Sequence, residues 1–252
     1  MPSQSATASF QQVTQVDADS PTLIEGLPGH GLVAAIAVDQ ITKQLNLTHM
    51  GNIVSDAFPP VVTFEDGLVQ DLVRVYGAAE PAVMALESDL ALPHEAFEPL
   101  SKCVIEDLAD EFSRAIFLAG APAETEDELG KVTGVATTEA IKSDLVQAGI
   151  TIAEDLGLVG GVTGALVREC YQADVPAGLL IVRSHPFLPD PKAAKSVIET
   201  ALEPLVEFDI DTTELDEQSK EIQRRMQQIA EQYQQMAEEP LAEEHPVRGM
   251  YQ

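Results

Sequence analysis

The sequence at residues 22–45 is TLIEGLPGHGLVAAIAVDQITKQL, and this stretch decides the fold class. Residues 22–25 predict a short strand that ends at Gly26. Residues 32–45 then carry apolar side chains at positions 32, 33, 36, 37, 41 and 45, a spacing typical of a helix packed on a sheet. A strand, a glycine turn and a helix in that order indicate the beginning of an α/β domain.

The alternation of strands and helices continues to about residue 210. Asp66-Gly67 lies between two β-type segments and favours a tight hairpin, so part of the sheet is expected to be antiparallel. The predicted strands are 51–55, 60–64, 68–76, 82–86, 115–120, 132–136 and 177–183. The predicted helices are 95–112, 165–171 and 190–208, and residues 139–147 are predicted to form a helix or a turn. We therefore expect a polar segment over 1–20 and one three-layer αβα domain with a mixed sheet over 21–210.

Residues 211–239 differ in kind, because they contain no glycine and follow a heptad pattern. The pattern predicts a helix that either folds onto its own domain or joins copies of the chain through a coiled-coil seam. Only Ser219 interrupts the apolar seam positions, which are Leu215, Ile222, Met226, Ile229, Tyr233 and Met236. After the helix, residues 240–252 form an acidic tether with Pro240 and Pro246, expected to be extended and mobile.

The composition excludes some classes of partner. With 42 Asp and Glu against 14 Lys and Arg, the formal charge of −28 disfavours nucleic acid and anionic membrane surfaces. The acids are spread along the whole chain, as in proteins of a high-salt cytoplasm, although an ordinary acidic protein is the alternative. No basic start with an apolar core is found at the N-terminus, and no apolar run approaches 18 residues. A soluble cytoplasmic protein is expected.

Two glycine loops are the candidate ligand sites, Gly26 to Gly31 (GLPGHG) and Gly157 to Gly164 (GLVGGVTG). Each could hold a phosphate through backbone N–H groups, or could simply allow close packing of a helix on the sheet. Neither has the spacing of a dinucleotide fingerprint or the Lys-Ser/Thr pair of a P-loop. His30 is the most interesting histidine because it lies within the first loop.

No catalytic, cofactor-binding or metal-ligating residue is predicted. The chain has no GxSxG elbow, and Ser184-His185 adjacent in sequence cannot form a nucleophile and its base. Cys103 and Cys170 lack metal-ligand spacing, and we expect both to be reduced and buried.

The chain ends in Met250-Tyr251-Gln252, beyond the acidic tether. An exposed Met and Tyr there have no core to join, so an aromatic anchor could enter a pocket of another protein. The tripeptide resembles the hydrophobic-Tyr-any motif of proteasome activators and assembly chaperones. That resemblance implies that Tyr251 and the terminal carboxylate of Gln252 dock between adjacent α subunits of the 20S proteasome.

The body of the chain resembles the archaeal branch of the proteasome assembly chaperone 2 family over about residues 20–210. The stretches that carry the resemblance are LIEGLPGHGLV (23–33), Pro59-Pro60, Asp66-Gly67, Arg74-Val75-Tyr76, the strand ending at Gly120, GGVTG (160–164) and LPDPKAA (188–194). His30 departs from the small or aliphatic residue expected there. The resemblance implies an αβα fold like that of nucleoside phosphorylases, without established catalytic residues.

The leading hypothesis is thus a non-enzymatic homo-oligomeric proteasome assembly chaperone or ATP-independent 20S activator. One alternative is a phosphorylase-like or ligase-like enzyme that uses the glycine loops for phosphate. The other is a scaffold whose coiled coil is its only function.

Overall fold

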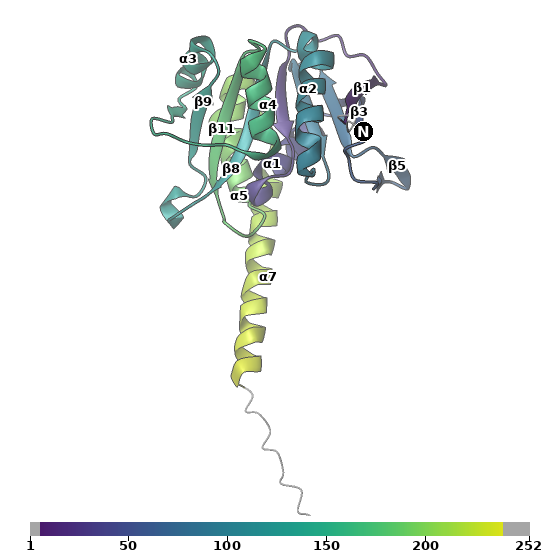
Figure 1. Cartoon of the computed structure of the whole chain (residues 1–252). Helices are drawn as coiled ribbons and strands as arrows, with labels where there is room; N and C mark the ends of the chain where they lie inside the picture. Colours follow the sequence, from purple (N-terminus) through teal and green to yellow (C-terminus); the bar gives the residue numbers. More distant parts are fainter. Residues whose placement is uncertain (1–5, 239–252) are drawn as a thin grey trace, which may run out of the picture.

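The computed structural model describes residues 6–238 and contains a large mixed sheet with helices on both faces (Figure 1). The sheet has nine strands in the order β1-β3-β6-β7-β2-β8-β11-β9-β10, and β4 and β5 form a separate hairpin. The strands are β1 Ala8–Gln12, β2 Thr22–Gly26, β3 Thr48–Ser55, β4 Thr63–Glu65, β5 Leu68–Gln70, β6 Val73–Ala78, β7 Val83–Ser88, β8 Arg114–Pro122, β9 Val132–Ala136, β10 Thr151–Ile152 and β11 Ala177–Ser184. The mixed α/β class predicted from the sequence is confirmed.

The helices divide between the two faces of the sheet. The side chains of α1, α3 and α5 belong to one core cluster, and those of α2 and α4 belong to the other. The helices are α1 Val33–Gln44, α2 Phe97–Leu108, α3 Glu139–Gln147, α4 Gly161–Gln172, α5 Pro191–Val197, α6 Glu203–Val206 and α7 Thr213–Glu238. Short 3-10 turns flank α1 and α2.

The centre of the sheet is parallel. β2 pairs in parallel with β7 and β8, and β8 pairs in parallel with β11. In contrast, β1, β3, β6 and β7 pair antiparallel in turn, and β9 pairs antiparallel with β11 but parallel with β10. The carboxyl ends of the parallel strands therefore meet at one edge, and α1, α2 and α4 begin near that edge. This edge of an α/β sheet is the usual location of ligand sites, which directs attention to the two glycine loops.

Alternation along the central strands builds both cores. Ile24 and Ile116 face the α1 side of the sheet, while Leu23 and Phe117 face the α2 side, and all four side chains are buried. Burial on both faces explains why β8 and β11 read as nearly continuous apolar runs. Each of these side chains contributes about 1.5–3 kcal/mol through burial of apolar surface.

Several boundaries differ from the predicted ones. Residues 68–76 form two strands, β5 and β6, because the chain leaves the hairpin after Gln70. The polar N-terminal segment contributes β1, which pairs with β3. The predicted helix over 190–208 contains a π-helical turn at Ile198–Leu202, next to Pro204, which has no N–H to donate to the preceding turn. The Asp66-Gly67 hairpin is confirmed, with φ of 50° and 79°.

The long helix α7 leaves the body of the protein (Figure 1). Its first turn is fixed to the body, because Leu215 is 1% exposed within the core and Asp216 Oδ2 lies 2.6 Å from Lys195 Nζ of α5. Further along, Ile222 is partly buried and Met226 is 41% exposed. The side chains of the last three seam residues, Ile229, Tyr233 and Met236, lie outside the described part. Among the described helices, none is long and apolar enough to span a membrane.

Candidate functional site

The first glycine loop is a packing device. A Cβ on Gly26 would lie 2.5 Å from Val38 Cβ of α1, so the close approach of helix and strand requires glycine. Gly31 has φ of 65°, and a Cβ there would lie 2.6 Å from Ser184 Oγ. His30, on the same loop, contacts β8 at Gly120, whose missing side chain makes room for the loop backbone. These glycines are explained by local structure without any ligand.

The second glycine loop is different, because three of its four glycines face open space. The fourth, Gly164, is packed, since a Cβ there would lie 2.4 Å from the Val159 carbonyl oxygen. A Cβ on Gly157, Gly160 or Gly161 would meet no atom within 4 Å. Gly161 has φ of 72°, a left-handed conformation that favours glycine. No side chain caps the N-terminus of α4, which begins at Gly161. The first-turn N–H groups of α4 are therefore available to a partner from outside the helix.

A cavity of about 910 Å³ lies beside this second loop. We name it the glycine-loop pocket. Its walls come from the segment 153–161, the first turns of α4, strands β8, β9 and β11, and the first glycine loop. The structure thus brings the two glycine loops to one cavity at the carboxyl edge of the parallel strands.

Glu25 lies directly behind this pocket and is fully buried. Its Oε1 accepts a hydrogen bond from Leu27 N at 3.1 Å, and its Oε2 accepts one from Leu118 N at 3.2 Å. Thr163 Oγ1 of α4 lies 3.4 Å and 3.5 Å from the two carboxyl oxygens. Removal from water raises the pKa of Glu25 from 4.5 to about 8, although the hydrogen bonds act in the opposite direction. Glu25 therefore joins β2, β8 and α4 through one carboxyl group that is mostly protonated at neutral pH.

Sequence reasoning did not identify Glu25, because one acid among 42 carries little information by itself. Its position was the available signal: a single acid within the apolar strand Thr22–Gly26, directly before the first glycine loop. His30, the histidine singled out from the sequence, has an unusual environment. Its Nε2 is buried and has no hydrogen-bond partner among the described residues, and the same holds for Ser184 Oγ.

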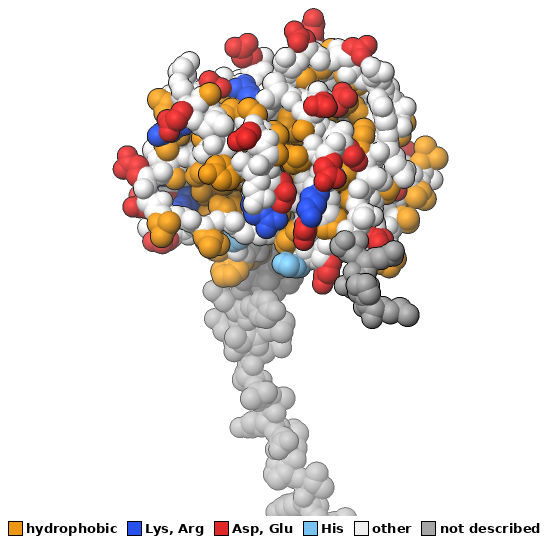
Figure 2. All heavy atoms as spheres, turned by 45° about the horizontal axis from the view of Figure 1, so that its top comes forward, with side chains coloured by type: hydrophobic (Ala, Val, Ile, Leu, Met, Phe, Trp, Pro, Cys, Tyr) orange, Lys and Arg blue, Asp and Glu red, His pale blue; other side chains and the backbone are white. Residues whose placement is uncertain are grey.

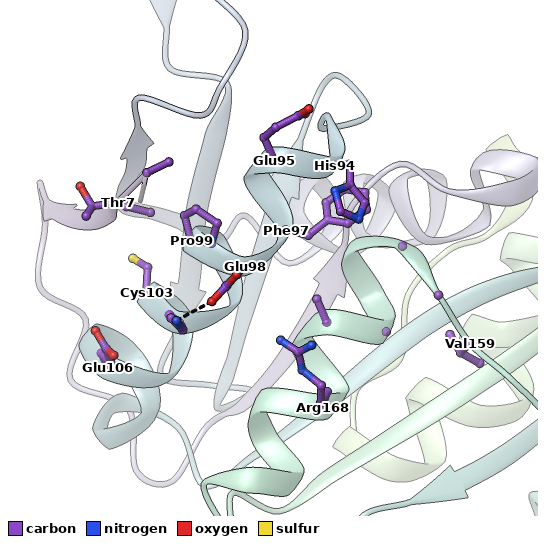
Figure 3. Close-up of a pocket in the computed structure, with 17 residues that line it drawn as sticks. Thr7, His94, Glu95, Phe97, Glu98, Pro99, Cys103, Glu106, Val159 and Arg168 are labelled. Atoms are coloured by element: carbon purple, nitrogen blue, oxygen red, sulfur yellow. Dashed lines mark hydrogen bonds and ion pairs between the residues drawn. The ribbon is translucent and has the colours of Figure 1, made fainter. Parts of the chain in front are cut away.

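A second cavity, of about 940 Å³, lies between α2 and α4 (Figure 3). Lys102 and Arg168 line it from the two helices, but each pairs with an acid of its own helix. Lys102 Nζ lies 2.6 Å from Glu98 Oε1, and Arg168 Nη2 lies 2.7 Å from Glu169 Oε1. The groove therefore offers little uncompensated positive charge to an anion.

Both cysteines are buried free thiols, as expected. Cys103 lines the groove between α2 and α4, and Cys170 belongs to α4. Burial raises the pKa of each thiol to about 12, with acids nearby adding to the shift. A thiol with so high a pKa is a weak nucleophile and a weak metal ligand at neutral pH. Within residues 6–238, no group of three His, Cys, Asp or Glu is placed to hold a metal ion.

Arg74 organises a polar cluster at the base of the β4–β5 hairpin. Its Nη1 and Nη2 donate to the two carboxylate oxygens of Asp89 at 2.5 Å and 3.0 Å, and its Nε donates to Tyr76 Oη at 2.9 Å. Nη1 also donates to the Asp71 carbonyl oxygen at 2.8 Å. The hydrogen bond from Arg74 lowers the pKa of Asp89. Because most of the guanidinium donors are used within the protein, this cluster fixes local structure and does not present a free anion site.

Two segments each contain several exposed apolar side chains. Figure 2 shows apolar side chains among numerous acids on one face of the molecule. One is the hairpin, where Phe64, Leu68 and Val69 are exposed. The other is the segment 153–160, where Leu156 and Leu158 are almost fully accessible. Clustered exposed apolar residues mark surfaces that contact other molecules.

The predicted partner-binding residues Met250, Tyr251 and Gln252 lie outside the described residues. Of the predicted seam, Leu215 contacts the core of its own chain and Met226 faces solvent. The residues with notable environments are instead Glu25, His30 and Thr163, at the edge of the parallel strands.

The fold and this edge define a class of α/β proteins in which one mixed sheet carries glycine loops at the ends of its parallel strands. Comparison with known sequences places the chain within that class. The model of the PAC2 family matches residues 23–230, and the chain belongs to this family. The family predicted from the sequence is therefore confirmed.

Relatives and solved structures agree with this assignment. An uncharacterized protein of Methanocaldococcus jannaschii is 28% identical over 190 residues, which cover 75% of this chain and 77% of that protein. Pyrococcus furiosus PbaA, an archaeal homolog of proteasome-assembly chaperone, has a similar structure with a TM-score of 0.80 at 23% identity, covering 93% of this chain and 95% of its own. P. furiosus PbaB, an archaeal proteasome activator, gives a TM-score of 0.78 at 20% identity, covering 89% and 99% of the two chains.

Proposed function

We propose that this protein is a non-enzymatic assembly chaperone or ATP-independent activator of the 20S proteasome. The proposal rests on membership of the PAC2 family and on the similarity of the fold to PbaA, a homolog of proteasome-assembly chaperone, and to PbaB, a proteasome activator. The sequence also contains Met250-Tyr251-Gln252, which resembles the hydrophobic-Tyr-any motif. In this proposal, the tripeptide docks into pockets between α subunits of the 20S ring.

The observation that carries the docking model is the attachment of α7. The helix is fixed at its root by Leu215 and by the ion pair between Lys195 and Asp216, and it extends 26 residues from Thr213 to Glu238. At about 1.5 Å per residue, this length is about 39 Å. Such a helix holds the start of the tether far from the acidic body, which favours contact between the tail and a partner while the body stays outside the ring.

Self-association would strengthen this contact. We infer that the heptad seam from Ile222 onward joins copies of the chain. Several tails on one oligomer would engage several pockets of one ring, and a short tether gives an effective concentration in about the millimolar range. Weak binding of a single tail then becomes tight binding of the oligomer. The spread of acids suits this assembly to a cytoplasm of high ionic strength.

A pull-down of purified 20S proteasome at matched salt tests the docking model. Tyr251→Ala is expected to lower binding at least about 30-fold, because loss of a buried aromatic anchor costs about 2 kcal/mol or more. Tyr171→Ala is the matched control, since Tyr171 is an exposed tyrosine on α4. Equal capture of 20S by wild type and by Tyr251→Ala would overturn the proposal.

A peptidase assay on mature 20S particles separates the two proposed roles. An activator increases hydrolysis of a small fluorogenic peptide by finished particles, whereas an assembly chaperone increases the yield of particles formed from free subunits.

A further inference from the structure

The carboxyl group of Glu25 is buried on the α4 side of the sheet and takes no part in the proposed proteasome contact. Side chains alternate along β2, so Glu25 shares a face with Leu23, which belongs to the core beneath α2 and α4. Glu25 is 0% exposed, and a glutamate is almost never buried to this extent without a charged partner. Its hydrogen-bond partners in the described chain are two backbone N–H groups and one hydroxyl, with no cation among them. Pairing of charges therefore does not account for this buried acid.

The carboxyl group joins two central strands to a peripheral helix. Leu27 follows β2 and Leu118 belongs to β8, and these two strands are neighbours near the centre of the nine-stranded sheet. Thr163 instead belongs to the first turn of α4, which packs over β8 and β11 (Figure 1). Separation of the strands would require unfolding of the domain. Displacement of the α4 turn is thus the less costly route for water to reach the carboxyl group.

Few contacts hold this turn and the segment before it. Within 153–163, Val162 is the one buried side chain, whereas Leu156 and Leu158 are almost fully accessible. A Cβ on Gly157 or Gly160 would meet no atom within 4 Å, and no side chain caps the N-terminus of α4. A segment with so few buried contacts can open locally while the rest of the domain stays folded.

Thr163 is the partner that a protonated Glu25 requires. The N–H groups of Leu27 and Leu118 can only donate, so Thr163 Oγ1 is the acceptor near a Glu25 O–H group in the described chain. After loss of the proton, Thr163 can donate to the carboxylate, but the charge remains removed from water. Burial is the largest cause that raises the pKa of Glu25 to about 8, and it outweighs all three hydrogen bonds. Protonation therefore favours the closed arrangement, and hydration of the carboxylate favours an open one.

We propose that Glu25 is a pH-sensitive latch for the segment 153–163. With its proton, the carboxyl group holds the first turn of α4 against the sheet through Thr163. When the proton is lost, the segment opens and admits water to the carboxylate, while the sheet stays folded. Opening uncovers the apolar floor of the glycine-loop pocket, which includes Ala119, Val135, Leu179 and Ile181.

Other titratable groups near this latch can be separated from it. Those on the elements around Glu25 form no hydrogen bond with it in the described chain, and they are His30, His94, Asp155, Glu98, Arg168 and Glu169. Glu87 of β7, whose pKa burial also raises, accepts a hydrogen bond from Thr42 of α1 on the opposite face of the sheet. Because His30 lies on the loop that directly follows β2, His30→Ala is the control for these neighbours.

Amide hydrogen exchange of the full-length protein tests the latch. Exchange is followed by mass spectrometry in about 1 M KCl, which screens the acidic surface. The readout is the protection of amides 164–167, whose hydrogen bonds within α4 end on carbonyl groups 160–163; Gly164 N, for example, donates to Gly160 O at 3.2 Å. The open state loses the Glu25 proton near pH 4.5 and the closed state near pH 8. After correction for intrinsic exchange rates, protection is expected to fall about 70-fold from pH 5.5 to pH 7.5.

Three substitutions connect this pH dependence to the latch. Glu25→Gln is expected to make the protection of amides 164–167 independent of pH. Thr163→Val removes the acceptor of the Glu25 O–H group and is expected to lower protection at pH 5.5 at least about fivefold. Thr163→Ser keeps the hydroxyl and is expected to remain close to wild type. His30→Ala is expected to keep the wild-type pH dependence.

Exchange in α1, on the other face of the sheet, reports unfolding of the whole domain. Low concentrations of urea separate this process from local opening, because local opening exposes little surface and depends weakly on urea. Amides 164–167 are therefore expected to exchange faster than those of α1 and with a smaller dependence on urea.

The latch is overturned if wild-type protection at amides 164–167 does not change with pH, or if Glu25→Gln shows the same change. It is also overturned if His30→Ala abolishes the pH dependence, or if these amides exchange at the rate and with the urea dependence of α1. If Glu25→Gln fails to fold, the wild-type profile and the two Thr163 variants decide. None of these results bears on the proteasome proposal, which is tested through Tyr251.

Discussion

Replacement of Glu25 by glutamine isolates the energetic effect of the buried carboxyl group. In the folded protein, burial raises the pKa of Glu25 to about 8, against 4.5 for an accessible glutamate. Between these two values, the folded state binds a proton that the unfolded state has released. Stability of the wild type therefore falls as the pH rises from about 4.5 to about 8, by up to about 1.4 kcal/mol per pH unit.

The glutamine variant lacks this pH dependence but loses a hydrogen bond. A carboxamide has one oxygen, whereas Glu25 accepts from both Leu27 N and Leu118 N. One buried N–H group is then left without an acceptor, at a cost of about 1–3 kcal/mol. We expect Glu25→Gln to be less stable than wild type at pH 5. The difference should disappear and change sign between about pH 5 and about pH 7, where the accumulated loss of wild type equals this cost, and by pH 8 wild type has lost about 4–5 kcal/mol.

Urea unfolding of both proteins at constant KCl over pH 5–9 measures this difference. Other groups with shifted pKa values, such as Glu87, are present in both proteins and cancel. Glu95→Gln, at an exposed acid, is the control and should track wild type at every pH. A difference between wild type and Glu25→Gln that stays constant from pH 5 to pH 8 would refute the reasoning.

Three further predictions concern packing, charge and assembly. Gly26→Ala should lower stability by about 1–3 kcal/mol, since its Cβ would lie 2.5 Å from Val38 Cβ, while Gly160→Ala, which meets open space, should be nearly neutral in urea unfolding. The melting temperature should fall on dilution from about 1 M to about 0.01 M salt, as the screening length grows from about 3 Å to about 30 Å, and an unchanged melting temperature would favour an ordinary acidic protein. If the seam joins copies of the chain, Ile222→Lys combined with Ile229→Lys should lower the mass measured by light scattering, because charges in an apolar interface are strongly unfavourable. Unchanged mass with lower stability would instead indicate that the helix packs on its own domain.

The fold class could be predicted because each helix and strand leaves its own pattern of apolar residues within a short segment of the sequence. Residues 32–45 have the apolar spacing of a helix, and α1 occupies almost these limits. The apolar runs at 115–120 and 177–183 correspond to β8 and β11, whose side chains are buried on both faces. The local hydrophobic pattern is sufficient to predict an element wherever its buried side chains recur with the period of a helix or a strand.

Other features depend on contacts between distant residues and could not be predicted in this way. β1 contains mostly polar residues and is a strand because it pairs with β3. Leu215 fits a heptad seam by spacing, but the position of α5 places it in the core. The two glycine loops look alike in sequence, and only the surroundings of each glycine show that Gly26 and Gly31 are packed whereas Gly157 and Gly160 face open space.

The central claim is that the C-terminal tail contacts the α ring of the 20S proteasome. The most direct measurement places a photo-reactive phenylalanine derivative at position 251 of the full-length chain and irradiates it with purified 20S particles. The account predicts adducts with α subunits, which an excess of a peptide corresponding to residues 240–252 suppresses. Adducts formed only within the chain or between its own copies, with none to α subunits, would contradict the account.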